Sequence, residues 1–432
     1  MKNFKVLPIT LAVAASLSSV SAFAAESNVA DLEKRIQELE AKVVQIDYVN
    51  DQQQAVLTPD TKVPEGLIFS GYARYGAHYS DGDSRYVNVG SSGRSVGRLG
   101  NEGNGGEFQI GKIFQADNGA KWDIVVMFDE WAHRDWGSDG GVSLKKAYAG
   151  VTNVFDSQPE LYMWAGRDFH GRQQQGLNDY FLFTHDGQGA GFNNLNLGGA
   201  KLDMGFVGKV DSNGGSLNND NGVYAITSKL HGINAGIGNL DLYFNYGFAS
   251  DEADAELQDE TSWQVGATLG LGSSNKLVMK YADGADDSAF DLAGDKQVLY
   301  TSLEGNYRVS DQFIVDYLVS YKNLSGEDVL NWDGTVNEER NEYSAIMRPQ
   351  YQWDEVHSTW LEAGYAMEDH DSGKEVTGWK VTLSQNVSLG GLPWSRPMLR
   401  FYTTVGDVTT DEVAYEYNND TLAVGAMFEA WW

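Results

Sequence analysis

The run Leu240-Asp-Leu-Tyr-Phe-Asn-Tyr-Gly-Phe248 places an apolar or aromatic side chain at every second position. The positions between them carry Asp241, Tyr243, Asn245 and Gly247. Successive side chains of an extended strand point to opposite faces, so this run gives one face an apolar surface and the other a more polar one. It predicts a strand of about ten residues whose two faces meet different surroundings.

The same alternation recurs from Gly66 to the end of the chain, between clusters of Gly, Asn and Asp. It is seen at 67–80, 313–322, 359–368 and 422–432, within roughly sixteen to eighteen such segments. Strands of about ten residues suit a tilted bilayer crossing, whereas strands of soluble sandwiches average about five or six residues. The pattern therefore predicts an antiparallel transmembrane β-barrel with lipid outside and an aqueous bore inside.

Composition removes several classes of protein. The absence of Cys rules out disulfides and Cys-based metal or redox sites, and the formal net charge of −30 argues against nucleic acid as a partner. Outside the N-terminus, no apolar run approaches the roughly 18 residues of a membrane helix. Acidic stretches such as 250–260 suit external loops but do not match a calcium-binding loop, so we expect no metal and no cofactor.

Residues 1–24 have the features of a secretory signal. Lys2 and Lys5 precede the apolar stretch Val6–Ala15, and the small residues of Ser21–Ala24 follow it. The alternative is a buried helix, which this order of features disfavours. We therefore expect the protein to be exported.

Residues 25–50 are expected to form a short periplasmic coiled-coil helix. Their apolar positions are spaced alternately three and four apart, at Val29, Leu32, Ile36, Leu39, Val43 and Ile46. A helix this short is marginal in water, which favours association with copies of itself over a lone helix docked on the body. The polar residues 51–65 are interpreted as a linker, and residues 66–432 as the barrel domain.

Two kinds of inward-facing side chain would suit a sugar path. Aromatic rings stack on the apolar C–H faces of a pyranose ring, and charged groups hydrogen-bond its hydroxyls. Alternation assigns Tyr72 and Arg74 to the inner face of the first strand and Trp431 to that of the last. These strands become neighbours when the barrel closes.

Further charged residues are candidates for the bore. Alternation assigns Lys145 to the inner face of its strand, and Lys146 and Tyr148 to the outer face. The other candidates are Arg98, Glu107, Arg172 and Asp179. For any one of them alone, a solvated charge in the bore is the simpler interpretation, and only the set favours a sugar path.

The sequence resembles the LamB-type maltoporins and related carbohydrate porins in ordered pieces between Gly71 and Trp432. These pieces include 71–74, 98–102, 164–167, 189–191, 347–353, 362–365, 395–397 and 429–432. The resemblance implies an all-β, 18-stranded homotrimeric barrel in the Gram-negative outer membrane, with an inward-folded loop narrowing each channel. The heptads at 25–50 look more like the extension of sucrose-type porins.

The resemblance also implies roles for single residues. It assigns an aromatic slide to Tyr72, Trp136 and Trp431, with Trp136 reaching into a neighbouring subunit's mouth, and places Phe181 where the family has a constriction Tyr. The implied constriction charges are Arg74, Arg98, Glu107, Lys145, Arg172 and Asp179. Lys145 stands where the family has Arg, whose planar fork a Lys lacks. Two further slide aromatics of the family are replaced here, within Gly103–Gly106 and near Val408.

These observations predict a carbohydrate-selective outer-membrane porin that passes maltose, maltodextrins or similar oligosaccharides. Its expected partners are the sugar, outer-membrane lipid and two further copies of the chain, and docking of a periplasmic sugar-binding protein is left open. The alternatives are a general diffusion porin, a porin preferring another sugar such as sucrose, and an outer-membrane hydrolase. The seven His residues show no recognisable catalytic or metal-ligand spacing, which disfavours the hydrolase.

Overall fold

The computed structural model describes residues 60–63, 66–81, 86–132, 141–210, 221–272, 274–329, 338–391, 393–410 and 420–432. The predicted signal and coiled-coil segments lie outside these residues, as does most of the predicted linker. Regular structure in the described residues is entirely β-strand. No helix among them is long and apolar enough to cross a membrane.

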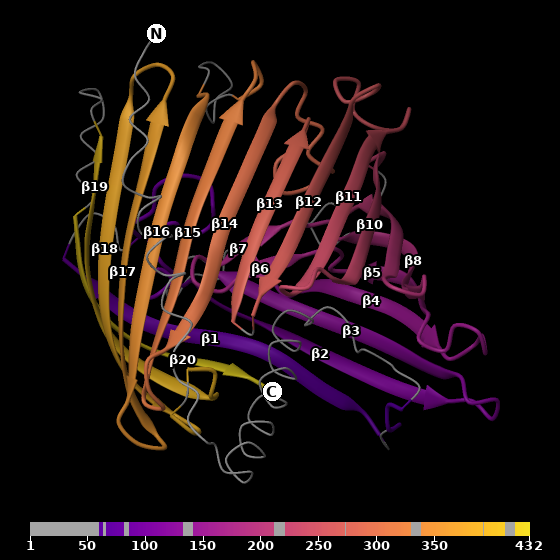
Figure 1. Ribbon diagram of the computed structural model, residues 1–432, viewed down its shortest axis with the longest axis horizontal. Helices are drawn as coiled ribbons and strands as arrows, with labels where there is room; N and C mark the ends of the chain where they lie inside the picture. The colour runs from indigo at the N-terminus through magenta and orange to yellow at the C-terminus, as the bar shows by residue number, and fades with distance from the viewer. Residues whose placement is uncertain are drawn as a thin grey trace. The chain divides into compact units, whose positions relative to one another are not determined.

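The described strands follow one another as a long series of antiparallel hairpins. Labelled as in Figure 1, they are β1 (Ile68–Ser80), β2 (Asn104–Gln115), β3 (Lys121–Ala132), β4 (Ser143–Thr152), β5 (Tyr162–Asp168), β6 (Gln173–Gln175), β7 (Tyr180–Leu182), β8 (Gly187–Asn196), β9 (Lys201–Lys209), β10 (Val223–Asn234), β11 (Asn239–Ala249), β12 (Thr261–Leu271), β13 (Asn275–Asp283), β14 (Gln297–Arg308), β15 (Phe313–Ser325), β16 (Arg340–Gln352), β17 (His357–His370), β18 (Glu375–Ser388), β19 (Met398–Thr410) and β20 (Thr421–Trp431).

All of these strands except β6 and β7 form a single 18-stranded antiparallel sheet. Figure 1 shows β10 to β19 side by side in chain order along one wall. The sheet closes on itself because β1 pairs with both β2 and β20. Closure leaves no strand edge unpaired, which is what a sheet surrounded by lipid requires. The predicted 18-stranded barrel is therefore confirmed.

The two faces of the wall differ as the alternation predicted. On β11, Phe244 is 48% exposed, whereas its neighbour Asn245 is 3% exposed. On β20, Val424 is 47% exposed and Ala423 is 2% exposed. The outer surface is thus a band of apolar side chains suited to lipid, and the polar side chains point into the barrel.

The hairpins give the barrel two different ends. Short turns such as 197–200 and 235–238 lie at one end, the turn end, and longer loops such as 169–186 and 284–296 lie at the other, the loop end. Several of the long loops contact the inner wall.

The loop between β1 and β2 packs inside the barrel. Its Val87, Val89 and Val96 cluster with Ala366 of β17 and Val408 of β19. Gly364 of β17 makes the approach possible, since a Cβ atom there would lie 2.1 Å from the carbonyl oxygen of Val96. This loop therefore thickens the wall formed by β16 to β19.

The loop that carries β6 and β7 packs on the neighbouring part of the inner wall, against β11 to β16. Phe183 stacks on Tyr243 of β11 with ring centroids 4.7 Å apart, and Tyr180 packs edge-on against Tyr300 of β14 at 5.2 Å. His185 joins this loop to the loop at 284–296, because its Nε2 accepts a hydrogen bond from the Ala289 amide at 3.1 Å. The resemblance implied one inward-folded loop, and the structure has three such segments among its described residues.

Candidate functional site

The site is built where the first and last strands of the barrel meet. Tyr72 of β1 and Trp431 of β20 are partners in the antiparallel register. Their rings are stacked, with centroids 6.5 Å apart and planes 20° from parallel. The hydroxyl of Tyr72 donates a hydrogen bond to Oε1 of Glu429 at 2.9 Å. Both rings are partly exposed on the inner face, as alternation along the two strands predicted.

A third ring, absent from the predicted set, joins this pair. Trp131 of β3 stacks on Tyr72 with centroids 6.1 Å apart and planes 27° from parallel. Alternation along β3 contained the signal, because the inward positions Asp123 and Asp129 are both odd-numbered and Trp131 continues that series. The rings of β3, β1 and β20 therefore form a continuous row across the inner wall.

Arg74 fastens the loop that carries β6 and β7 to this row of rings. Its Nη2 lies 3.1 Å from Oδ2 of Asp179, and its Nε donates to the Gly103 carbonyl at 3.0 Å. Gln174 donates to the other oxygen of Asp179 at 2.7 Å. Burial alone would raise the pKa of Asp179, but Arg74 and Arg98 outweigh it and hold that pKa below its usual value. The carboxylate therefore stays charged at neutral pH.

Glu429 of β20 binds three guanidinium groups next to the rings, and two of them, those of Arg396 and Arg400, are buried. It accepts from Arg98 at 3.1 Å, from Arg396 at 2.9 Å and from Arg400 at 2.7 Å. The Arg396 guanidinium also lies 4.2 Å from the centroid of the Trp431 ring. Burial would lower the pKa of Arg98, but Glu429 and the other acidic neighbours raise it well above its usual value. This network keeps every charge paired in a poorly solvated place.

A second charged group lies around Arg172, in the loop before β6. Its Nε donates to Oδ1 of Asp186 at 2.8 Å. Its guanidinium carbon lies 3.5 Å from the centroid of the Phe169 ring and 5.3 Å from that of Phe181. Phe181, predicted in place of a constriction Tyr, thus packs beside Arg172.

Two further predicted charges lie on the barrel wall. Glu107 of β2 pairs in register with Tyr72 on one side and Asp129 on the other. Lys145 of β4 reaches the same Asp129, with Nζ 3.6 Å from its Oδ2. Both residues therefore lie beside the row of rings and not within the Glu429 network.

Alternation predicted that Lys146 and Tyr148 face outward, opposite Lys145, and this prediction was wrong. Lys146 is fully buried, with its Nζ 3.0 Å from Oδ1 of Asp168, and Tyr148 is also buried on the inner face. Met127 of β3 pairs with Lys146 and the next residue, Phe128, pairs with Leu144, so Lys145 is the extra residue of a β-bulge in β4. A bulge adds one residue to a strand, so side chains beyond the bulge point to the opposite face from the one that a simple two-residue count assigns.

The structure thus brings together Tyr72, Trp431, Arg74, Arg98 and Asp179 in one connected cluster. Arg172 and Phe181 form a separate group. Trp136 lies outside the described residues. No group of three or more His, Asp or Glu side chains within the described ranges is placed to hold a metal ion.

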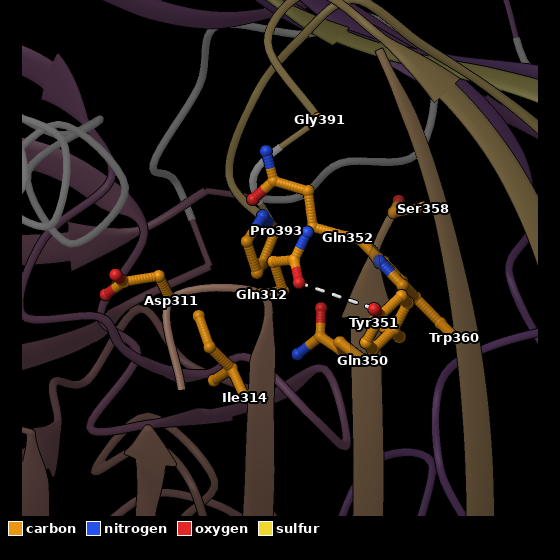
Figure 2. Close-up of a pocket in the computed structure, with 10 residues that line it drawn as sticks. All are labelled: Asp311, Gln312, Ile314, Gln350, Tyr351, Gln352, Ser358, Trp360, Gly391 and Pro393. Carbon is orange, nitrogen blue, oxygen red and sulfur yellow. Dashed lines mark hydrogen bonds between the residues drawn. The ribbon is translucent and has the colours of Figure 1, made fainter. Parts of the chain in front are cut away.

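A small pocket lies apart from the rings, at the turn end of β15, β16 and β17 (Figure 2). Figure 2 shows Gln312 and Tyr351 turned toward one another, and the Tyr351 hydroxyl donates to Gln312 at 3.4 Å. Gln350 and Trp360 line the same pocket. It contains none of the predicted site residues.

Comparison with known proteins agrees with this architecture. A family model described as LamB porin matches residues 67–432. A maltoporin of Photobacterium profundum is 26% identical over 414 residues, which cover 88% of this chain and 96% of that protein.

Solved structures also match, at low sequence identity. Pseudomonas aeruginosa OccK3 (OpdO) is 14% identical with a TM-score of 0.47, over 88% of this chain and 98% of that chain. P. aeruginosa OccD3 (OpdP) is 12% identical with a TM-score of 0.48, over 88% of this chain and 95% of that chain.

Proposed function

This chain belongs to the LamB porin family, and from that premise we propose that it carries maltose, maltodextrins or similar oligosaccharides across the outer membrane. It is an outer-membrane β-barrel, and its family points to a transport channel and not to an enzyme. The resemblance to a maltoporin at 26% identity supports a glucan as the preferred sugar. Transport is then diffusion down a gradient, without covalent chemistry.

The observation that carries the proposal is the stack of Tyr72 on Trp431 next to paired charges. Ring faces hold the apolar side of each pyranose unit, while charged groups exchange hydrogen bonds with its hydroxyls. A sugar chain held in this way moves through the channel in single file and still dissociates readily, because each contact is weak and the next contact resembles it.

The remaining residue roles belong to the same proposal. Trp136 and Phe181 are proposed to extend the aromatic path, and Arg74, Arg98, Glu107, Lys145, Arg172 and Asp179 to supply the constriction charges. We further propose a homotrimer, a cleaved signal at 1–24 and a periplasmic coiled coil at 25–50 joined to the barrel by 51–65.

The test is ion conductance through the purified protein in planar bilayers. Maltohexaose, sucrose and cellobiose are added in turn to one side, and the current is followed over increasing sugar concentration. We expect saturable block, strongest with the maltodextrin. Equal conductance with and without every sugar would favour a general diffusion porin, whereas stronger block by sucrose would reassign the substrate.

A further inference from the structure

Three aromatic rings, and not two, form the row on the inner wall. Tyr72 lies in the middle, with Trp131 at 6.1 Å on one side and Trp431 at 6.5 Å on the other. The planes of each pair are within 27° of parallel. Trp131 comes from β3, which does not pair with β1, so its side chain has to cross β2 to reach Tyr72.

Gly105 of β2 provides the room for this crossing. It pairs in register with Trp131 on one side and with Arg74 on the other. A Cβ atom at Gly105 would lie 2.3 Å from Cε3 of Trp131, which is too close for any side chain. The absence of a side chain on β2 thus allows the indole to lie across the strand toward Tyr72.

Each end of the row has a guanidinium beside an indole. The Arg74 guanidinium carbon lies 5.1 Å from the Trp131 ring centroid, and that of Arg396 lies 4.2 Å from the Trp431 ring centroid. Asp179 holds Arg74 in place by a 3.1 Å ion pair. Both ends therefore combine an apolar ring with nearby hydrogen-bond donors, the combination that suits a pyranose unit.

From this geometry we propose that Trp131 is a sugar-binding residue that makes the path selective for longer oligosaccharides. This inference rests on the proposed sugar transport and adds one contact to the same site. Its ring lies one row of the sheet nearer the loop end than Tyr72 and Trp431, because Trp131 pairs across Gly105 with Arg74. A chain of several pyranose units spans all three rings, whereas a disaccharide leaves an end ring unoccupied. Trp131 therefore contributes more to the binding of long sugars than of short ones.

The experiment compares sugar block of ion current in wild type, Trp131→Ala, Trp131→Phe and Trp122→Ala. Trp122 is the matched control, because it lies on the same strand but is 46% exposed on the outer face. We expect Trp131→Ala to weaken block by maltohexaose about two- to tenfold, the equivalent of about 0.4–1.4 kcal/mol at 1.4 kcal/mol per tenfold. Block by maltose should change less. Trp131→Phe should retain most of the affinity, and Trp122→Ala all of it.

A second variant, Gly105→Ala, displaces the indole without removing it and should weaken maltohexaose block in the same direction. Sugar-free conductance of each variant shows that the pore has folded and inserted. The inference is overturned if maltohexaose blocks Trp131→Ala as strongly as it blocks wild type. It is also overturned if the affinities for maltose and maltohexaose fall by the same factor and ion selectivity changes as well, because that result means that Trp131 only supports Arg74. Absence of block in wild type would instead remove the proposed function.

Discussion

The hydroxyl of Tyr72 donates to Glu429 at 2.9 Å, so one of the rings that line the bore is held by the carboxylate that also accepts hydrogen bonds from three guanidinium groups. Tyr72 stands on β1 and Glu429 on β20, the two strands whose pairing closes the barrel. Closure of the sheet and placement of the ring therefore depend on the same contact.

Glu429→Gln should be strongly destabilising. The change leaves the buried Arg396 without a carboxylate partner, whereas Arg98 and Arg400 keep Glu102, and a buried charge that loses its partner costs roughly 3–5 kcal/mol. Denaturant unfolding of the barrel in detergent measures the loss. Glu160→Gln is the control, because its ion pair with Lys201 is exposed and should be worth less than about 1 kcal/mol. Equal stability of the two variants would contradict the role given to Glu429.

Lys380→Met should release the loop between β1 and β2. Lys380 is fully buried and its ammonium donates to the Gly97 carbonyl at 2.7 Å and also to the Leu99 carbonyl. Without these bonds, two buried carbonyl groups lose a partner and the loop separates more readily from β18. We expect noisier single-channel current and faster proteolysis within 86–103. The exposed Lys201→Met serves as the control, and unchanged noise in both variants would argue against this anchor.

Sugar block should be insensitive to pH between about 7 and 5. The pKa of Asp179 is held below its usual value by Arg74 and Arg98, against the effect of burial. A carboxyl with a depressed pKa contributes its stabilisation above its usual pKa of about 3.9 and loses it as the pH falls through the lower native value. Block constants measured over a pH series should therefore weaken only below about pH 4. A midpoint near pH 6 would mean that the Arg74–Asp179 pair does not order the site.

Acid should weaken the packing of the infolded loops through His185. Its Nε2 accepts from the Ala289 amide and its Nδ1 donates to the Phe183 carbonyl at 2.8 Å, an arrangement that only the neutral ring can make. Burial lowers the pKa of His185 to about 3.

The unfolded chain binds this proton at about pH 6.5, so the contribution of His185 to the free energy of unfolding should fall as the pH drops from about 6.5 toward 3. His185→Gln should flatten that dependence in denaturant titrations. The same pH dependence of stability in wild type and in His185→Gln would contradict the assignment.

Alternation of side chains carried most of the fold prediction, because it depends only on the strand period. It separated Phe244 from Asn245 and placed Tyr72 beside Trp431 before any register was known. It failed at Lys146, since the β-bulge that reverses the parity depends on pairing with β3. The strand period also placed Trp131 on the inner face, but its contact with Tyr72 depends on Gly105 lying between them in the register.

Ion pairs between distant loops and strands were the least predictable feature. Nothing local to Arg98 indicates that it meets Glu429 at the far end of the chain. Such contacts arise only after the loops have folded against the inner wall. The predicted charges were therefore identified by residue type and parity, without their partners.

Labelling of single cysteines tests the central claim most directly, because the chain has no Cys of its own. Ser70 lies on the inner face next to Tyr72, whereas its neighbour Phe69 is 57% exposed on the outer face. In membranes, Ser70→Cys should react quickly with a charged, water-soluble maleimide, maltohexaose should slow that reaction, and Phe69→Cys should remain unlabelled. Rapid labelling of Phe69→Cys, or labelling of Ser70→Cys at a rate that maltohexaose does not change, would contradict an aqueous bore that binds sugar beside Tyr72.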